Sequence, residues 1–265
     1  MDPVAVREIF DKTLRADPPP ALGVERTWFD GVLRLTHGDH HFIGWWDFPP
    51  DRTAAIVARE AARVRSSGGE LQWQVCGHDR PDGLERALAD AGFEDQGLET
   101  FLVLEASAIA DLRRPQGVDV RRVRTEEELA SYIAVEREAF DEEWTRQPLK
   151  DLYLPRLDDP SVMLLLAYLD GQPAASGCLD APENCPFAGL NGAGVVPRHR
   201  GKGLYRALVA DRAAEAARRG ASYLVTNARE TSRRILERLG FELLATRHTW
   251  MLKAPNLAPS AQQRS

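Results

Sequence analysis

The residues best placed for chemistry form a glycine-punctuated basic turn, RHRGKG, at 198–203. An apolar strand ends just before it at Val196, and an amphipathic helix follows it. Gly201 and Gly203 let the backbone N–H groups face one point, where the positive end of the helix also favours phosphate. Basic side chains add charge there: Arg198, Arg200 and Lys202. The alternative is an ordinary strand-to-helix turn on a basic surface.

Alternating strands and helices surround this turn in the second half of the chain. The run VMLLLAYL is apolar throughout and predicts a buried central strand. The full pattern predicts strands at 118–123, 162–169, 174–179, 185–196 and 222–226, helices at 126–140 (capped by Thr125), 203–219 and 232–239, and a closing strand pair at 242–253.

The first half repeats part of this pattern. It predicts a helix at 2–16, strands over 25–48 with a turn at Gly38-Asp39, a helix at 51–65, a strand at 70–77, a helix at 81–91 and a strand pair ending at 105. LERALADAGFE in this half matches ILERLGFE in the second, which indicates an internal duplication.

The turn resembles motif A of the GNAT superfamily of acyl-CoA N-acyltransferases, in which Arg198, Gly201 and Gly203 occupy the defining positions. The resemblance covers residues 118–253, and the first half resembles a degenerate repeat whose residues 48–53, FPPDRT, lack the glycines. It implies an α+β fold of two tandem GNAT-like units, the second complete and with a splayed central sheet. We therefore expect an N-terminal domain at 1–105, a linker at 106–117, a catalytic domain at 118–253 and a disordered tail at 254–265.

The resemblance also implies how acetyl-CoA would bind as co-substrate. A bulge in the fourth strand would part it from the fifth, so that the pantetheine arm bonds to the exposed strand edge, with an oxyanion donor at the N–H of Val195 or Val196. The diphosphate would lie on the amides of residues 200–205. The implied cofactor-binding residues are Gly194, Val195, Val196, Arg198, Arg200, Gly201, Lys202, Gly203, Leu204, Tyr205 and Asn227. For Tyr205, packing is the alternative role, and for Asn227 it is turn formation.

The catalytic residues depart from the family pattern. Leu236 occupies the position at which many members have a proton-donating Tyr, and Ser232 lies one turn earlier on the same helix face. The fourth strand has no carboxylate to act as a base. Asn191 could instead order a water, and Glu183 in the preceding loop could reach the amine. Helix capping by Ser232 and simple solvation of Glu183 are the alternatives.

Composition limits the remaining function classes. A net charge of −6 argues against nucleic acid or anionic lipid as a partner. Three cysteines lack disulfide or C-x-x-C spacing, residues 1–10 do not resemble a signal peptide, and no apolar run is of membrane-spanning length. We expect a cytoplasmic monomer or homodimer without a metal, in which the tryptophans 45 and 46 beside two histidines serve packing.

The sequence therefore predicts an N-acyltransferase that moves acetyl from acetyl-CoA to an amine of a small molecule or peptide by direct attack in a ternary complex. The acidic residues 141–143 could favour a cationic acceptor or simply be solvated. The alternative from another class is a catalytically inactive acyl-CoA sensor or scaffold.

Overall fold

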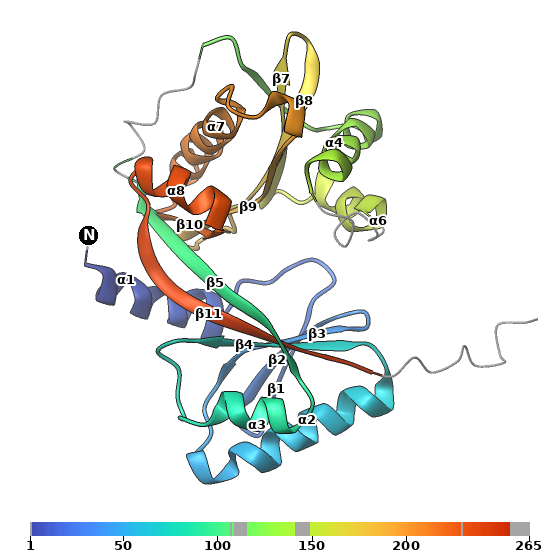
Figure 1. The fold of residues 1–265 in the computed structure, drawn as a ribbon, viewed down its shortest axis with the longest axis vertical. Coiled ribbons are helices and arrows are strands. Elements are labelled where there is room, and N and C mark those ends of the chain that lie inside the picture. The colour runs from blue at the N-terminus through green and yellow to red at the C-terminus, as the bar shows by residue number, and fades with distance from the viewer. Residues whose placement is uncertain (1, 107, 109–115, 141–148, 229, 255–265) are drawn as a thin grey trace, which may run out of the picture. The chain divides into compact units, whose positions relative to one another are not determined.

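The computed structural model describes residues 2–106, 108, 116–140, 149–228 and 230–254, without the side chains of 230 and 231. The chain forms two compact units, each described by itself (Figure 1). The C-terminal unit is Leu102–Glu242, and the N-terminal unit is Asp2–Phe101 together with the residues from Leu243 onward. Most of the predicted linker, the acidic residues 141–143 and nearly all of the predicted tail lie outside the described residues.

The N-terminal unit is a mixed sheet with two helices packed on it. Its elements are α1 Pro3–Phe10, a π-helical turn Asp11–Ala16, β1 Glu25–Phe29, β2 Val32–His37, β3 His40–Trp46, α2 Thr53–Ser67, β4 Glu70–Cys76, α3 Leu84–Asp90, β5 Glu94–Glu105 and β11 Glu242–Lys253. The strand order is β1-β2-β3-β4-β11-β5. Strands β3 and β4 pair in parallel, and β1-β2-β3 and β4-β11 are antiparallel. The predicted turn at Gly38-Asp39 is confirmed, between β2 and β3.

The C-terminal unit has the same plan. Its elements are β6 Asp119–Arg122, α4 Glu126–Ala139, α6 Leu149–Tyr153, β7 Val162–Leu169, β8 Gln172–Asp180, β9 Phe187–Val195, α7 Leu204–Arg218, β10 Tyr223–Ala228 and α8 Glu230–Arg238. The strand order is β5-β10-β9-β8-β7-β6, with β5 contributing its last residues, 102–105. Helix α4 begins with a capping box between Thr125 and Glu128, which confirms the predicted cap.

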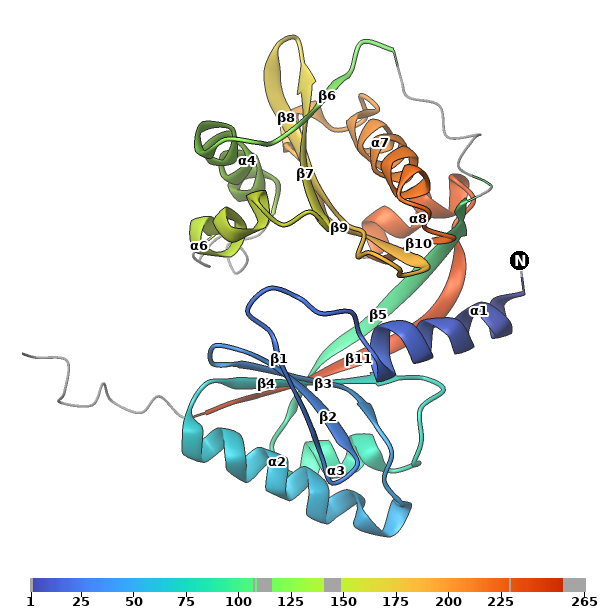
Figure 2. The same cartoon turned by 180° about the vertical axis from the view of Figure 1, so that it is seen from behind.

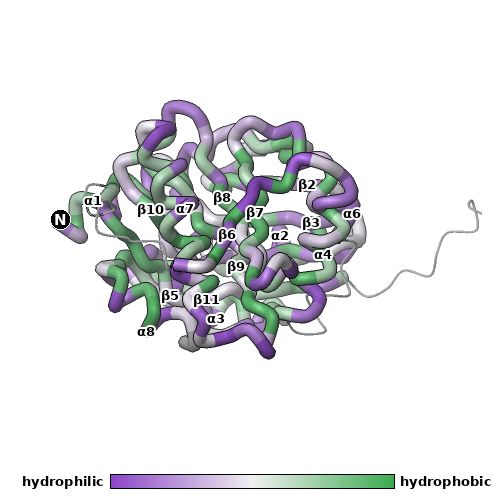
Figure 3. Tube along the Cα trace, turned by 90° about the horizontal axis from the view of Figure 1, so that it is seen from above, coloured by the Kyte–Doolittle hydropathy of each residue, from purple (hydrophilic) through white to green (hydrophobic). Residues whose placement is uncertain are grey.

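Strand β7 shows why its sequence is apolar without interruption. Met163, Leu165 and Ala167 pack in the core beneath α7. Leu164 and Leu166 point the other way, into a second core beneath α4. Successive side chains of a strand alternate between faces, so a strand covered on both sides needs apolar residues at every position. Figures 1 and 2 show α7 on one face of this sheet and α4 with α6 on the other, and Figure 3 shows the hydropathy along the chain.

Two predicted strand pairs are wrong. Residues 94–105 form the single strand β5, and residues 242–253 form the single strand β11. The run ELLATRHTWMLK contains no Gly, Pro, Asn or Asp, so nothing in it favours a turn. From Leu243, moreover, β11 belongs to the N-terminal unit, where Arg247 to Lys253 pair with β4. The final strand of the chain thus completes the sheet of the first half.

Candidate active site

Strands β9 and β10 pair only briefly, which opens the sheet of the C-terminal unit. They run in parallel from Phe187 opposite Tyr223 to Gly189 opposite Val225. Directly beyond, the Thr226 hydroxyl donates a hydrogen bond of 2.8 Å to the Leu190 carbonyl, and no further β9–β10 pair occurs among the described residues. The second half of β9 therefore keeps a free edge on the side facing β10.

The predicted bulge in this strand is confirmed. Between the pairs Ser176–Gly194 and Cys178–Asn191, the register against β8 shifts by one residue. Gly192 lies in the shifted segment with φ +51°, a left-handed conformation that side chains disfavour. Bulges bend a strand and increase its twist, which accounts for the parting of β9 from β10.

The backbone directions at the end of β9 decide between the two expected oxyanion donors. The Val196 N–H donates to the Ala174 carbonyl of β8 at 3.0 Å, so this amide is already used. Neighbouring residues of a strand point their N–H groups to opposite edges, so the Val195 N–H faces away from β8. The Val195 carbonyl likewise faces away from β8, since it accepts a hydrogen bond from Arg200 Nε at 3.2 Å. Of the two expected alternatives, the Val196 N–H is therefore occupied, and the Val195 N–H is the one directed away from β8. Its role as an oxyanion donor stays a prediction.

The glycine turn has the conformation that the sequence predicts. Gly201 and Gly203 have φ values of +78° and +82°, and α7 begins directly after them. The first helical hydrogen bond runs from the Ala207 N–H to the Gly203 carbonyl at 3.0 Å. Within the described part of the chain, the N–H groups of residues 201–206 have no hydrogen-bond partner. These amides and the end of a 15-residue helix form a suitable site for an anion.

The three basic side chains of the turn differ in their contacts. Arg198 forms an ion pair with Glu138 near the end of α4. Arg200 donates to the carbonyls of Val195 and Ala139. Lys202 is exposed and has no partner among the residues that the structure describes. Lys202 is thus the one cation of the turn whose charge is uncommitted in that set.

Tyr205 and Ser232 form a hydrogen bond on the α7 side of the sheet. Tyr205 is half-buried against the core, which supports packing as one of its roles. Burial raises the pKa of its hydroxyl, and the opposing effects of Arg212 and Ser232 leave the pKa above its usual value. Leu236 is only 1% exposed and belongs to the core, so it is structural.

Arg212 is a residue that sequence reasoning missed. This side chain of α7 is 1% exposed and donates hydrogen bonds to the carbonyls of Leu208, Cys178 and Asn191 at 3.0, 3.1 and 3.1 Å. It reaches through the space left by Gly177, where a Cβ would lie 3.3 Å from the guanidinium carbon. Burial lowers its pKa, although an arginine remains charged near neutral pH. Arg212 therefore ties β8 to β9 at the bulge.

On the opposite face of the sheet, Asn191 is bound to a carboxylate. Its Nδ2 donates to Asp180 Oδ2 at 2.5 Å. Asp180 ends β8 and lies opposite Gly189 of β9. The sequence analysis considered the fourth strand and the loop before it, and so missed this carboxylate on the neighbouring strand β8. The half-buried Asp180 is a carboxylate close to the open edge.

A buried polar cluster adjoins the bulge on the same face. Glu136 of α4 is fully buried and accepts hydrogen bonds from the Ser176 hydroxyl at 2.8 Å and from the Tyr153 hydroxyl at 3.2 Å. A Cβ on Gly192 would lie 3.8 Å from the Tyr153 oxygen. Burial raises the pKa of Tyr153 well above its usual value, so the phenol stays protonated and donates. This cluster, also missed from the sequence, fixes α4 against the bulge.

The remaining predicted residues are placed differently. Asn227 lies on β10 beyond the point of parting. Glu183 lies in the exposed loop before β9, whereas the bulge at Gly192 is five residues into that strand. Glu183 thus lies outside the strand segment that forms the open edge, and its role stays a prediction.

No group of three or more His, Cys, Asp or Glu side chains in the described ranges could hold a metal ion. None of the helices described is long and apolar enough to cross a membrane.

Comparison with known proteins identifies the class to which this site belongs. Residues 129–241 match the model of the acetyltransferase (GNAT) family. This segment of the C-terminal unit is thus similar to the GNAT-family acetyltransferase domain, and it includes the bulge, the glycine turn and α7. No curated protein matches the chain.

Solved structures extend the likeness to both units at the level of the fold. A GCN5-related N-acetyltransferase from Kribbella flavida is 19% identical with a TM-score of 0.67, and the match covers 97% of this chain and 96% of that one. A tandem GNAT protein from the clavulanic acid biosynthesis pathway is 16% identical with a TM-score of 0.62, covering 86% and 79%. A GCN5-related N-acetyltransferase from Sphaerobacter thermophilus is 14% identical with a TM-score of 0.59, covering 86% and 82%. The tandem α+β fold is confirmed.

Proposed function

We propose that the C-terminal unit is an acyl-CoA-dependent N-acyltransferase that transfers acetyl from acetyl-CoA to a primary or secondary amine. The observation that carries the proposal is the run of N–H groups at residues 201–206, which have no partner in the described part of the chain and which follow the free edge of β9 along the sequence. The amides fit a diphosphate, and the free strand edge fits the amide groups of a pantetheine arm. The exposed Lys202 adds a positive charge at the same place.

The residues around the bulge have distinct proposed roles. Acetyl-CoA supplies a thioester as the electrophile. The Val195 N–H stabilises the oxyanion that develops on the acyl oxygen, a contribution of about 10²–10³ in rate for one donor. Asn227 on β10 forms a hydrogen bond with an amide group of the pantetheine arm. Arg212 holds the carbonyls on either side of the bulge, so that the Val195 donor keeps its direction.

The two faces of the sheet offer different proton chemistry. We assign the amine to the α4 face, where Asp180 with its partner Asn191 accepts a proton directly or through water. On the α7 face, Ser232 with Tyr205 supplies a proton to the leaving thiolate. Glu183, in the exposed loop before β9, has no role in this scheme. A ternary complex suits the site, since positioning two reactants accounts for much of the acceleration in such reactions.

Thiol release measures this activity, with acetyl-CoA and a panel of polyamines, aminoglycosides, amino acids and peptides. Binding of acetyl-CoA and of free CoA is measured in parallel by calorimetry. Gly201→Asp places a carboxylate at the anion site, and we expect at least about tenfold weaker binding. Gly220→Asp is a matched control: Gly220 follows the other end of α7, has φ +83°, and like Gly201 has no atom near the added Cβ. Equal binding by parent and Gly201→Asp would refute the anion site.

A non-catalytic acyl-CoA sensor is the second candidate. The observation that favours it is Leu236, a core residue where many relatives have a proton-donating Tyr. Tight binding of acetyl-CoA without thiol release across the whole panel would select the sensor. Release with any amine above the hydrolysis background would exclude it.

A further inference from the structure

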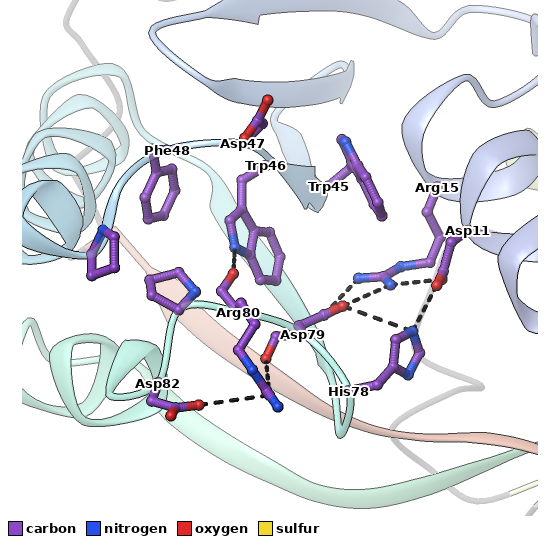
Figure 4. A pocket seen from close by; sticks show the side chains of 12 residues that line it. Asp11, Arg15, Trp45, Trp46, Asp47, Phe48, His78, Asp79, Arg80 and Asp82 are labelled. Atoms are coloured by element: carbon purple, nitrogen blue, oxygen red, sulfur yellow. Dashed lines mark hydrogen bonds and ion pairs between the residues drawn. The ribbon is translucent and has the colours of Figure 1, made fainter.

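The N-terminal unit contains a cavity of about 740 Å³ that none of the roles above uses (Figure 4). It lies where β3 ends at Trp45 and Trp46 and where the chain leaves β4 through His78 and Asp79. Cavities of 300–1,000 Å³ are typical of small-molecule sites.

The cavity occupies the position that corresponds to the open edge of the C-terminal unit. Strands β3 and β4 pair in parallel from His40 opposite Glu70 to Ile43 opposite Trp73, and no later β3–β4 pair occurs in the described residues. Two parallel strands that part toward their carboxyl ends thus occur in both units. The duplication inferred from the sequence places related clefts in the two units.

This second cleft lacks the features that suit a diphosphate. The chain leaves β3 through Pro49 and Pro50, which have no N–H to offer, in place of a glycine turn. The cavity wall carries four carboxylates against two guanidinium groups: Asp11, Asp47, Asp79 and Asp82 against Arg15 and Arg80. An acyl-CoA would therefore meet net negative charge and few free donors.

The cationic side chains of the wall are already engaged. Arg15 donates to both oxygens of Asp79 at 2.8 and 2.6 Å and to Asp11 at 2.8 Å. Arg80 forms an ion pair with Asp82, with 3.6 Å between Arg80 Nη1 and Asp82 Oδ1. Burial raises the pKa of Asp11, but hydrogen bonds from His78 and Arg15 lower it by more, so this carboxyl is ionised near neutral pH. Figure 4 shows Asp11, Arg15, His78 and Asp79 together on one side of the cavity, and the pair of Arg80 and Asp82 apart from them.

Aromatic rings form much of the remaining wall. Trp46 donates from its indole nitrogen to the Arg80 carbonyl at 2.6 Å and lies 6.4 Å from Phe48 in a stacked arrangement. Trp45 is half-buried, and the Arg15 guanidinium lies over its ring, with the guanidinium carbon 5.4 Å from the ring centroid. Asp47, which follows the two tryptophans, is exposed, and its carboxylate has no partner among the described residues. The cavity thus joins fixed rings to an uncompensated negative charge.

We propose that this cavity binds an organic cation, a compound with a protonated amine or guanidinium group on an aromatic or alkyl body. The rings pack against the apolar body and offer their faces or edges to the cation. The Asp47 carboxylate attracts its charge, and Asp82, which lies beside Arg80, adds to this attraction. The site belongs to the N-terminal unit and is independent of the acyl-CoA site proposed above.

Tryptophan fluorescence and calorimetry on the full chain, without acetyl-CoA, test this proposal. The probes are 2-phenylethylammonium, the neutral 2-phenylethanol and the anionic 3-phenylpropionate. We expect the cation to bind at least about tenfold more tightly than either isostere. The double variant Asp47→Asn/Asp82→Asn should weaken cation binding about fivefold, the value expected for two exposed charges.

Two variants locate the bound probe. Asp51→Asn removes a nearby carboxylate that does not line the cavity and should leave binding unchanged. Gly201→Asp alters the C-terminal unit and should also leave it unchanged. The proposal is overturned if no saturable binding occurs up to about 10 mM cation, or if either isostere binds equally well. Equal binding by the double variant and the parent, or loss of binding in Gly201→Asp, would also overturn it.

Discussion

Replacing Arg212 with Met tests whether a buried guanidinium holds the bulge of β9 in place. Arg212 lies among backbone carbonyls, and its side chain bonds to Cys178 on β8 and to Asn191 on β9. Methionine fills a similar volume without a donor. Arg212→Met therefore removes two bonds that join neighbouring strands and leaves the helix backbone intact.

The size of the effect follows from the acceptors. Each buried acceptor that loses its partner costs about 1–3 kcal/mol. The Leu208 carbonyl adds little, because it also receives the backbone N–H four residues later along α7. Part of this loss is offset, because a buried charge no longer has to be desolvated. We therefore expect Arg212→Met to lower the free energy of unfolding by about 3 kcal/mol. For a chain of this size, that lowers the Tm by roughly 6–12 °C.

Thermal unfolding followed by circular dichroism measures this shift. Arg218→Met is the matched control, since Arg218 lies in solvent on the same helix and its one ion pair among the described residues is with Glu215. We expect this exposed substitution to change the Tm much less than Arg212→Met does. We also expect Arg212→Met to lower kcat/KM for acetyl-CoA by up to about 10², the cost of a 1 Å misplacement. A Tm equal to that of the parent would refute the account of Arg212 as a clamp.

Three further predictions concern the same unit. Asp180→Asn should lower kcat by about 10² with KM for acetyl-CoA unchanged if Asp180 accepts the proton; unchanged kcat in thiol release would exclude that role. Gly194→Ala should destabilise by about 1–3 kcal/mol in urea unfolding, because the new methyl would lie 2.7 Å from Ala139 Cβ; equal stability would show that α4 yields freely. The Arg218 hydrogen bond chiefly lowers the pKa of Glu215, to about 2. The stabilisation is therefore present above about pH 4.5 and is lost as pH falls through about 2. Glu215→Gln should thus be less stable than the parent at pH 6 by under about 1 kcal/mol and equal only well below about pH 2; a constant difference across pH would contradict this.

Local features of the site could be predicted from the sequence because neighbouring residues determine them. The positive φ values at Gly201 and Gly203, and the unpaired amides at a helix start, follow from a short stretch of chain. These features need no knowledge of distant contacts. The bulge near Gly192, by contrast, was expected from the resemblance to the GNAT superfamily and not from the local sequence.

Features that depend on pairing between segments could not be predicted in the same way. Asp180 reaches Asn191 only through the β8–β9 register, and Glu136 reaches Ser176 because α4 packs over β8. Periodicity locates a strand but does not say which strand it joins, so β11 was expected in the wrong unit. The direction of the Val196 N–H could not be predicted either, because it depends on the pairing of Val196 with Ala174 of β8.

The placement of β11 has a consequence for how the protein is made. During synthesis the N-terminal sheet lacks its partner for β4 until Leu243 to Lys253 have left the ribosome, although the rest of that unit emerged more than a hundred residues before. The edge of β4 stays open throughout this interval and offers unpaired backbone to any other strand. A fragment that stops before residue 242 would keep that edge exposed permanently, so cutting the gene between the two halves is a poor way to obtain either one in a soluble state.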